Sequence, residues 1–164
     1  MVDYISLEEQ VDADFSRARR RALLRNVRIH GRRDADSDGL LCFDDLRNIP
    51  GALGRIYRGM RMVPVAQIGG NVGRCSEFDR DFMPTRACVE ERWKRIDRAF
   101  HRCEVLPPVS LYKVGGLYFV LDGHHRVSVA CYHGVKSIDA EVTEFGATGL
   151  QSNPSDKEAL KEAS

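Results

Sequence analysis

The sequence predicts an α+β fold, in which helices flank a small mixed β-sheet and a long helix forms an N-terminal extension. The chain has 164 residues, of which 43% are hydrophobic, so it is large enough to bury one core. Two short apolar runs, VSLYKV and LYFVL, are separated by Gly115–Gly116 and predict a β-hairpin. Apolar residues at helical spacing before these runs predict two helices, and a short segment that Gly134 ends predicts another after them.

The N-terminal region, residues 1–60, is expected to be helical. Ser6 and Glu9 have the spacing of a capping box, in which each side chain bonds to the other residue's backbone N–H. Apolar residues then recur every three or four positions: Leu7, Val11, Phe15, Ala18 and Ala22. We therefore expect a long helix that ends near Gly31.

Arginine dominates the second half of this helix. Between Arg17 and Arg33 the chain has eight arginines and no acidic residue. Such a segment could contact the phosphates of a nucleic acid. Alternatively, it is a solvated helix face whose arginines pair with acidic side chains elsewhere in the fold. Both interpretations are compatible with the sequence.

An acidic run follows, between Asp34 and Asp45. Its acids and its glycine occupy several positions of a calcium-binding loop. However, the twelfth position is Asp45 instead of a bidentate glutamate, and Pro50 and Gly51 shorten the helix that follows. We interpret the run as a turn before a short helix, Phe43–Ile49, and expect no calcium affinity tighter than about millimolar.

Residues 61–145 carry the pattern of the sheet and its helices. Met62–Ile68 predicts a short strand, and GGNVGR predicts a loop after it. A second helix is indicated by a further apolar stripe: Val89, Trp93, Ile96 and Phe100. After the hairpin, a helix from about His125 to Tyr132 precedes a last strand, SIDAEVTEF. Residues 146–164 are small and polar, which is typical of a flexible tail.

The strongest chemical signal is DGHHR, residues 122–126, where a strand is predicted to lead directly into a helix. Gly123 permits a tight turn there. The first turn of a helix exposes backbone N–H groups and the positive end of the dipole, so it can bind an anion. His124, His125 and Arg126 add side-chain donors, and Asp122 could hold Mg²⁺ or act as a catalytic base. The sequence therefore predicts a phosphate site.

Two other interpretations of DGHHR stay open. The two histidines could form half of a zinc site that Cys131 or His133 completes, although the spacing matches no standard zinc template. Asp122 could instead cap the helix in a purely structural turn. The five cysteines are odd in number and show no CxxC spacing, so we expect reduced thiols and a cytoplasmic protein.

From Val63 to Phe145 the chain resembles the ParB/sulfiredoxin superfamily, which includes the ParB-like nuclease domains. VPVAQI is similar to the family's first strand, and GGNVGRCSEFD is similar to a loop that ends in Arg and Phe-Asp, here Arg74, Phe78 and Asp79. The segment LPPVSLYKVGGLYFVLDGHHRVSVACYHGVKSIDAEV follows the family's order of strands, motif and helix. DGHHRVSVA stands in the place of a box that binds CTP in ParB and ATP in sulfiredoxin.

The resemblance implies a nucleotide site, with ATP, ADP or CTP as ligand and Mg²⁺ as cofactor. Its residues would be Arg74, Gly123, His124, His125 and Arg126. His124 stands where sulfiredoxin has its catalytic cysteine and where ParB has a glutamate, so the chain departs from both. The order D-G-H-x-R looks more like the free-serine kinases of the superfamily, whose catalytic aspartate corresponds to Asp122.

Two classes of function follow. One is a magnesium-dependent phosphotransferase or phosphohydrolase that acts on a small molecule, with Asp122 as base or metal ligand. The alternative is a non-catalytic module that binds a nucleotide through DGHHR and DNA through the Arg17–Arg33 helix. The chain has 25 basic and 24 acidic residues, so its net charge of +1 gives no general indication of a nucleic-acid partner. No apolar window is long enough to predict a membrane span.

Overall fold

The computed structural model describes residues 5–30, 40–43, 53–74 and 76–147. In chain order its elements are α1 (Leu7–His30), β1 (Leu41–Cys42), β2 (Leu53–Pro64), β3 (Ile68–Asn71), α3 (Glu90–His101), β4 (Val109–Val114), β5 (Leu117–Asp122), α4 (His124–Tyr132) and β6 (Ser137–Ala147). The predicted class, a mixed sheet flanked by helices with an additional N-terminal helix, is confirmed.

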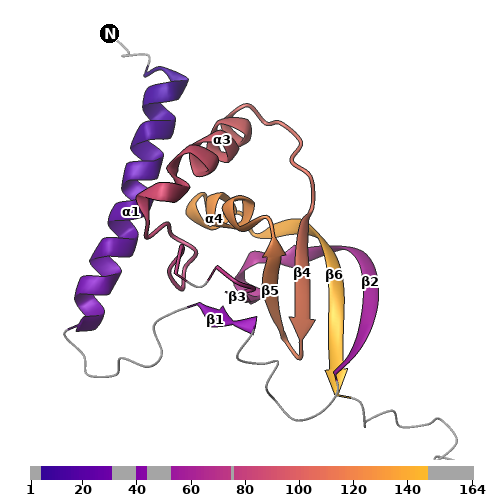
Figure 1. Cartoon of the computed structure of the whole chain (residues 1–164). Coiled ribbons are helices and arrows are strands. Elements are labelled where there is room, and N and C mark those ends of the chain that lie inside the picture. The colour runs from indigo at the N-terminus through magenta and orange to yellow at the C-terminus, as the bar shows by residue number, and fades with distance from the viewer. Residues whose placement is uncertain (1–4, 31–39, 44–52, 75, 148–164) are drawn as a thin grey trace, which may run out of the picture.

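The six strands form one sheet in the order β1-β3-β5-β4-β6-β2. The hairpin β4–β5 is antiparallel, as the two glycines predicted, and β3 pairs in parallel with β5. On the other side, β4 runs parallel to β6, with Val109 opposite Ala140. The chain therefore leaves the middle of the sheet at the end of β5, and α4 begins at that point (Figure 1).

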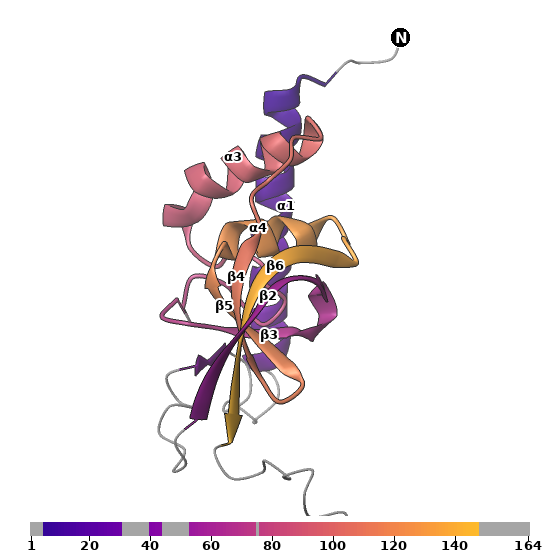
Figure 2. The same cartoon turned by 90° about the vertical axis from the view of Figure 1, so that its right-hand side faces the viewer.

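The α-helices of the described residues lie together beside the sheet. In both views α4 is next to the strands, α3 packs on α4, and α1 runs alongside (Figures 1 and 2). Trp93 of α3 is fully buried where the helices meet, and its ring lies 5.5 Å from that of Phe15 in α1. The Trp93 indole N–H donates to Ser128 of α4 at 2.8 Å, and the Ser128 hydroxyl donates to the Phe82 carbonyl. This chain of bonds joins α3 to α4 inside the core.

The start of α1 follows the sequence prediction. The Ser6 backbone N–H donates to the Glu9 carboxylate at 2.9 Å, and the Glu9 N–H donates to the Ser6 hydroxyl at 3.2 Å, which completes the capping box. The apolar stripe faces the core, with these residues buried: Val11, Phe15, Ala18 and Ala22. The helix is thus part of the same core as the sheet.

The division at residue 61 is wrong, because the sheet begins earlier. β2 starts at Leu53 and pairs with β6 along its whole length, from Leu53 opposite Ala147 to Pro64 opposite Ser137. Residues 53–60 are therefore strand and not part of a helical region. β2 is an edge strand whose large apolar side chains are mostly exposed, so its sequence lacks the clean alternation that marks a half-buried strand. Its partner lies about 80 residues away, and only that pairing defines it.

The predicted strand and loop around residue 68 also differ from the structure. The extended run breaks at Val65–Gln67, a single 3₁₀ turn, and GGNVGR is not all loop, because Gly69–Asn71 continue into β3. A Cβ atom on Gly70 would lie 2.4 Å from both the Leu41 carbonyl oxygen and the Phe119 ring. Glycine is required here because β1 and an aromatic ring approach the strand closely.

Several expectations fall outside the described residues. These include most of the acidic run Asp34–Asp45, most of the helix Phe43–Ile49, and the tail beyond residue 147. Among the described residues, no helix combines the length and the apolar character that a membrane crossing requires.

Among the cysteines that the structure describes, the expectation of reduced thiols is wrong for Cys42. Cys42 is disulfide-bonded, whereas Cys88, Cys103 and Cys131 are free. Disulfide formation depends on how closely two cysteines approach in the fold, and spacing along the chain does not reveal that approach.

Candidate functional site

A pocket of about 340 Å³ lies at the N-terminal end of α4, where β5 ends. It is lined by Arg74, Arg92, Arg95, Ile96, Leu121, Asp122, Gly123, His124, His125 and Arg126. All six residues that the sequence singled out as site residues are in this set. Four arginines face one aspartate, so the pocket is strongly positive. We call it the anion pocket.

Gly123 makes the sharp connection between β5 and α4. Its φ angle is +94°, and a Cβ atom there would lie 2.6 Å from Val109 Cγ1. The Val127 N–H donates to the Gly123 carbonyl and closes the first turn of the helix. Gly123 is itself the N-cap and has no side chain to bond the first-turn N–H groups. The interpretation in which Asp122 caps the helix is therefore wrong.

Arg126 holds the pocket together instead of projecting freely into it. Its Nη1 donates to the carbonyls of Pro107 and Pro108, at 2.5 and 2.7 Å, and its Nη2 donates to Asp122 at 2.8 Å. Only 13% of its side chain is exposed, whereas 74% of the Asp122 side chain is. Most of the Arg126 donors that the sequence assigned to phosphate are thus used to join α4 to the segment before β4.

His124 is buried and His125 is half-buried, and both rings carry buried nitrogen atoms that lack a hydrogen-bond partner among the described residues. His124 is 5% exposed and its Nε2 has no hydrogen-bond partner, and neither ring nitrogen of His125 has one within the described part of the chain. Phe78 packs against both rings, parallel to His124 and edge-on to His125. Burial, assisted by the Arg74 charge, lowers the pKa of each imidazole to about 4. Both rings are therefore neutral at pH 7.

Arg74 reaches the pocket from the segment after β3. The buried Asn71 side chain accepts from the Arg74 N–H at 3.1 Å and donates to the Arg74 carbonyl at 3.2 Å, which fixes the backbone. The guanidinium bonds to both carboxylate oxygens of Glu77, the nearer at 2.9 Å. Part of its charge is thus already balanced.

Arg92 and Arg95 of α3 complete the pocket, and the sequence did not identify them. Both are exposed, and neither forms an ion pair with any residue that the structure describes. They lie three residues apart, beside the apolar stripe that includes Trp93, so a shared helix face was readable from their spacing. Their position next to His125 was not, because α3 and α4 are separate elements that the tertiary fold brings together.

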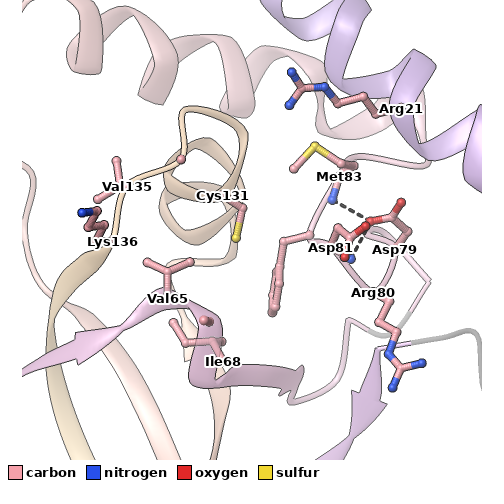
Figure 3. A pocket seen from close by; sticks show the side chains of 13 residues that line it. Arg21, Val65, Ile68, Asp79, Arg80, Asp81, Met83, Cys131, Val135 and Lys136 are labelled. Atoms are coloured by element: carbon pink, nitrogen blue, oxygen red, sulfur yellow. Dashed lines mark hydrogen bonds between the residues drawn. The ribbon is translucent and has the colours of Figure 1, made fainter.

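A larger cavity of about 740 Å³ lies near the opposite end of α4 (Figure 3). Figure 3 shows Cys131 facing the 79–83 segment across it. Asp79 accepts from the N–H groups of Asp81 and Met83, and burial raises the pKa of its carboxyl. Burial also raises the pKa of the Cys131 thiol to about 12, which makes it a poor nucleophile. The cavity is lined by both acidic and basic side chains, so its charge does not single out an anionic ligand as the anion pocket's does.

The metal interpretations fit the anion pocket poorly. Asp122 is the one carboxylate among its lining residues and is paired with Arg126, so the described residues offer no cluster of oxygen ligands for Mg²⁺ in this pocket. The zinc alternative needs Cys131 or His133 beside the two histidines. Instead, Cys131 lines the larger cavity and His133 bonds to Asp97 at 2.6 Å.

Comparison with known proteins does not assign the chain. No family model matches it, and no curated protein matches it. Among solved structures, it is similar to sulfiredoxin from Arabidopsis thaliana, with a TM-score of 0.37 and 18% sequence identity, over 51% of this chain and 82% of that one. A similarity at this level carries no argument about family or activity. Membership of the ParB/sulfiredoxin superfamily, and of its D-G-H-x-R branch, therefore stays a prediction.

Proposed function

We propose that the anion pocket binds the phosphate groups of a nucleotide. The observation that supports this most is the meeting of two kinds of unsatisfied group in one place. Arg92 and Arg95 bring positive charge without a partner among the described residues, and the buried imidazoles of His124 and His125 bring ring nitrogens without one. A buried polar group without a partner costs about 1–3 kcal/mol, and a bound phosphate would remove that cost.

Each group has a distinct role in this proposal. Exposed arginines bind phosphate oxygens through two parallel N–H bonds and supply most of the attraction. Neutral imidazoles donate one N–H each, and the first turn of α4 adds backbone N–H groups and the positive dipole end. Arg126 and Gly123 act on the shape of the pocket: one fixes the adjacent segment, and the other permits the turn.

Phosphoryl transfer is a separate question from binding. A transferase or hydrolase would need Asp122 as its base, yet this carboxylate accepts a bond from Arg126 and lies among positive charges. We therefore propose binding of ATP, ADP or CTP as the function, with Mg²⁺ entering as an ion bound to the ligand's phosphates. Turnover by an acceptor hydroxyl or by water is tested with Asp122→Asn, which should leave binding intact and abolish any turnover that exists.

Isothermal titration of the full chain tests the proposal. ATP, ADP, CTP and pyrophosphate would be titrated with and without Mg²⁺, into the wild type and into Arg95→Ala. We expect Arg95→Ala to weaken binding by roughly tenfold to hundredfold, because a charge-assisted hydrogen bond contributes about 1.5–3 kcal/mol. The matched control is Arg86→Ala, an exposed arginine that does not line the pocket. No saturable binding by the wild type, or equal losses in both variants, would refute the proposal.

The DNA-binding alternative gains no support from α1. Three of its arginines have partners within the fold: Arg17 pairs with Asp14, Arg25 with Asp81, and Arg21 lies over the Tyr132 ring at 4.7 Å. By contrast, Arg20 is exposed, and Arg19 Nε is buried without a hydrogen-bond partner among the described residues. The three contacts favour the interpretation of a helix face that pairs with the rest of the protein. Tight DNA binding that weakens steeply with salt would reverse this preference.

A further inference from the structure

Four metal-ligating side chains meet at a place that the anion pocket does not use. Asp14 comes from α1, Asp97 and His101 lie one turn apart on α3, and His133 directly follows α4. One ligand atom from each lies within 4.8 Å of the others. His133 Nε2 is 2.6 Å from Asp97 Oδ1, His101 Nε2 is 2.9 Å from Asp14 Oδ2, and His101 Nε2 is 3.5 Å from Asp97 Oδ2. We call these residues the helix-junction cluster.

Neighbouring groups orient Asp14 towards the other three residues. The Tyr132 hydroxyl donates to Asp14 Oδ1 at 2.8 Å, and Arg17 donates to the same oxygen at 3.1 Å. Both donors leave Oδ2 directed at His101. Outer hydrogen bonds of this kind hold ligands in position at metal sites and are a regular part of such sites. The His133 ring is held as well, by stacking on Phe100 at 4.2 Å.

Asp97 is the member that protein contacts alone do not explain. Its side chain is fully buried, and Oδ2 has no hydrogen-bond partner among the described residues. A buried ionised carboxylate with a free oxygen is costly, because desolvation penalises its charge. The free oxygen faces His101 Nε2 at 3.5 Å, too far for a good hydrogen bond but suitable for two atoms that share a metal.

We propose that the helix-junction cluster binds one divalent transition-metal ion, with Zn²⁺ as the best match. Two imidazole nitrogens and two carboxylate oxygens form a tetrahedral ligand set that suits zinc. Tetrahedral bonds of about 2.0–2.2 Å place ligand atoms roughly 3.3 Å apart, so separations that now range from 2.6 Å to at most 4.8 Å require side-chain shifts of up to about 1 Å. Imidazole ligands argue against Ca²⁺ and Mg²⁺, which take oxygen ligands. The two carboxylates balance the charge of the ion.

The ion would connect three helical segments that come from distant parts of the chain. Four protein ligands leave no open position, which is typical of a structural site and not of a catalytic one. The histidine side chains are 18% and 16% exposed, so an ion can reach them from solvent. Metal binding should therefore stabilise the docking of α1 on α3 and α4 and raise the melting temperature of the whole protein.

The test uses the untagged full chain after removal of metals with a chelator. Titration with ZnCl₂ should show one site per chain, and Co²⁺ should give the intense visible absorption of a tetrahedral centre. His133→Gln should lower Zn²⁺ affinity by at least a hundredfold, and Tyr132→Phe by roughly tenfold to a hundredfold, since it removes only an orienting bond. The matched controls are His125→Gln and the exposed Asp139→Asn, which should both bind zinc as the wild type does.

X-ray absorption on the zinc-loaded wild type needs no variant and so does not depend on whether His133→Gln folds. It should show two imidazoles, oxygen ligands and no sulfur. Sulfur scattering would place the ion on cysteine thiols and overturn the proposal, as would fewer than two imidazoles. Loss of binding in His125→Gln would move the site to the DGHH segment and overturn it too. A chain that remains folded without metal and binds no zinc at micromolar concentrations would do the same.

Discussion

Replacing Gly123 with alanine is the most direct test of how the fold builds the anion pocket. The residue has a φ angle of +94°, in a region that costs an L-residue about 1–2 kcal/mol. The new methyl group would also lie 2.6 Å from Val109 Cγ1 and 3.0 Å from Nε and Nη2 of Arg126. Overpacking of this kind costs about 1–3 kcal/mol, because Val109 is fully buried and cannot move freely. Together these effects predict a loss of about 2–5 kcal/mol in the free energy of unfolding.

Urea unfolding, followed by circular dichroism and by Trp93 fluorescence, measures this loss. The matched control is Gly116→Ala in the β4–β5 turn, where a Cβ atom would meet nothing within 4 Å and φ is not positive. That variant should stay within about 0.5 kcal/mol of the wild type or gain slightly, since alanine restricts the unfolded chain. If Gly123→Ala lost less than about 1 kcal/mol, or no more than Gly116→Ala, the turn would not have the strain that we assign to it.

Three further predictions concern protons, the core and the first helix. The pKa of His124 is about 4 in the folded protein and near 6.5 in the unfolded chain, so the unfolded chain binds more protons between these pH values, and acidification from pH 7 to 4 should lower the free energy of unfolding by roughly 3 kcal/mol. Urea titrations at pH 7, 5.5 and 4 should show a smaller decrease for His124→Asn than for the wild type. Parallel decreases in the two proteins would contradict this prediction. Ser128→Ala should lower the free energy of unfolding, measured by chemical denaturation, by about 2–4 kcal/mol, because the Trp93 N–H and the Phe82 carbonyl both lose their buried partner. A decrease below about 1 kcal/mol would contradict the importance of this chain of hydrogen bonds. Ser6→Ala should destabilise the protein by about 1 kcal/mol through loss of the capping box. Ser16, on the exposed side of the same helix, provides the control, and Ser16→Ala should be nearly neutral. Equal effects of the two substitutions would contradict the role that we assign to the cap.

The candidate site shows which of its features could be predicted from residue types alone. DGHHR predicted a strand, a glycine turn and a helix N-terminus, and all three are present because each depends on neighbouring residues only. The expected role of Arg126 changed, since the carbonyls of Pro107 and Pro108 are close to it only after the chain folds back. The helix-junction cluster was not predicted at all. Its four members are spread from Asp14 to His133, and nothing in their spacing connects α1 to α3.

The sequence by itself determined the local elements of this protein. The capping box of Ser6, the apolar stripe of α1, the Gly-Gly hairpin and the amphipathic pattern of α3 act within a few residues, so hydrogen bonding and hydrophobic periodicity are enough to specify them. Only the tertiary structure decided that residues 53–60 form an edge strand, that Gly70 lies under Phe119, and that arginines of α3 face the histidines of α4. Those features come from contacts between segments distant along the chain, and their free energy depends on the packing of the whole fold.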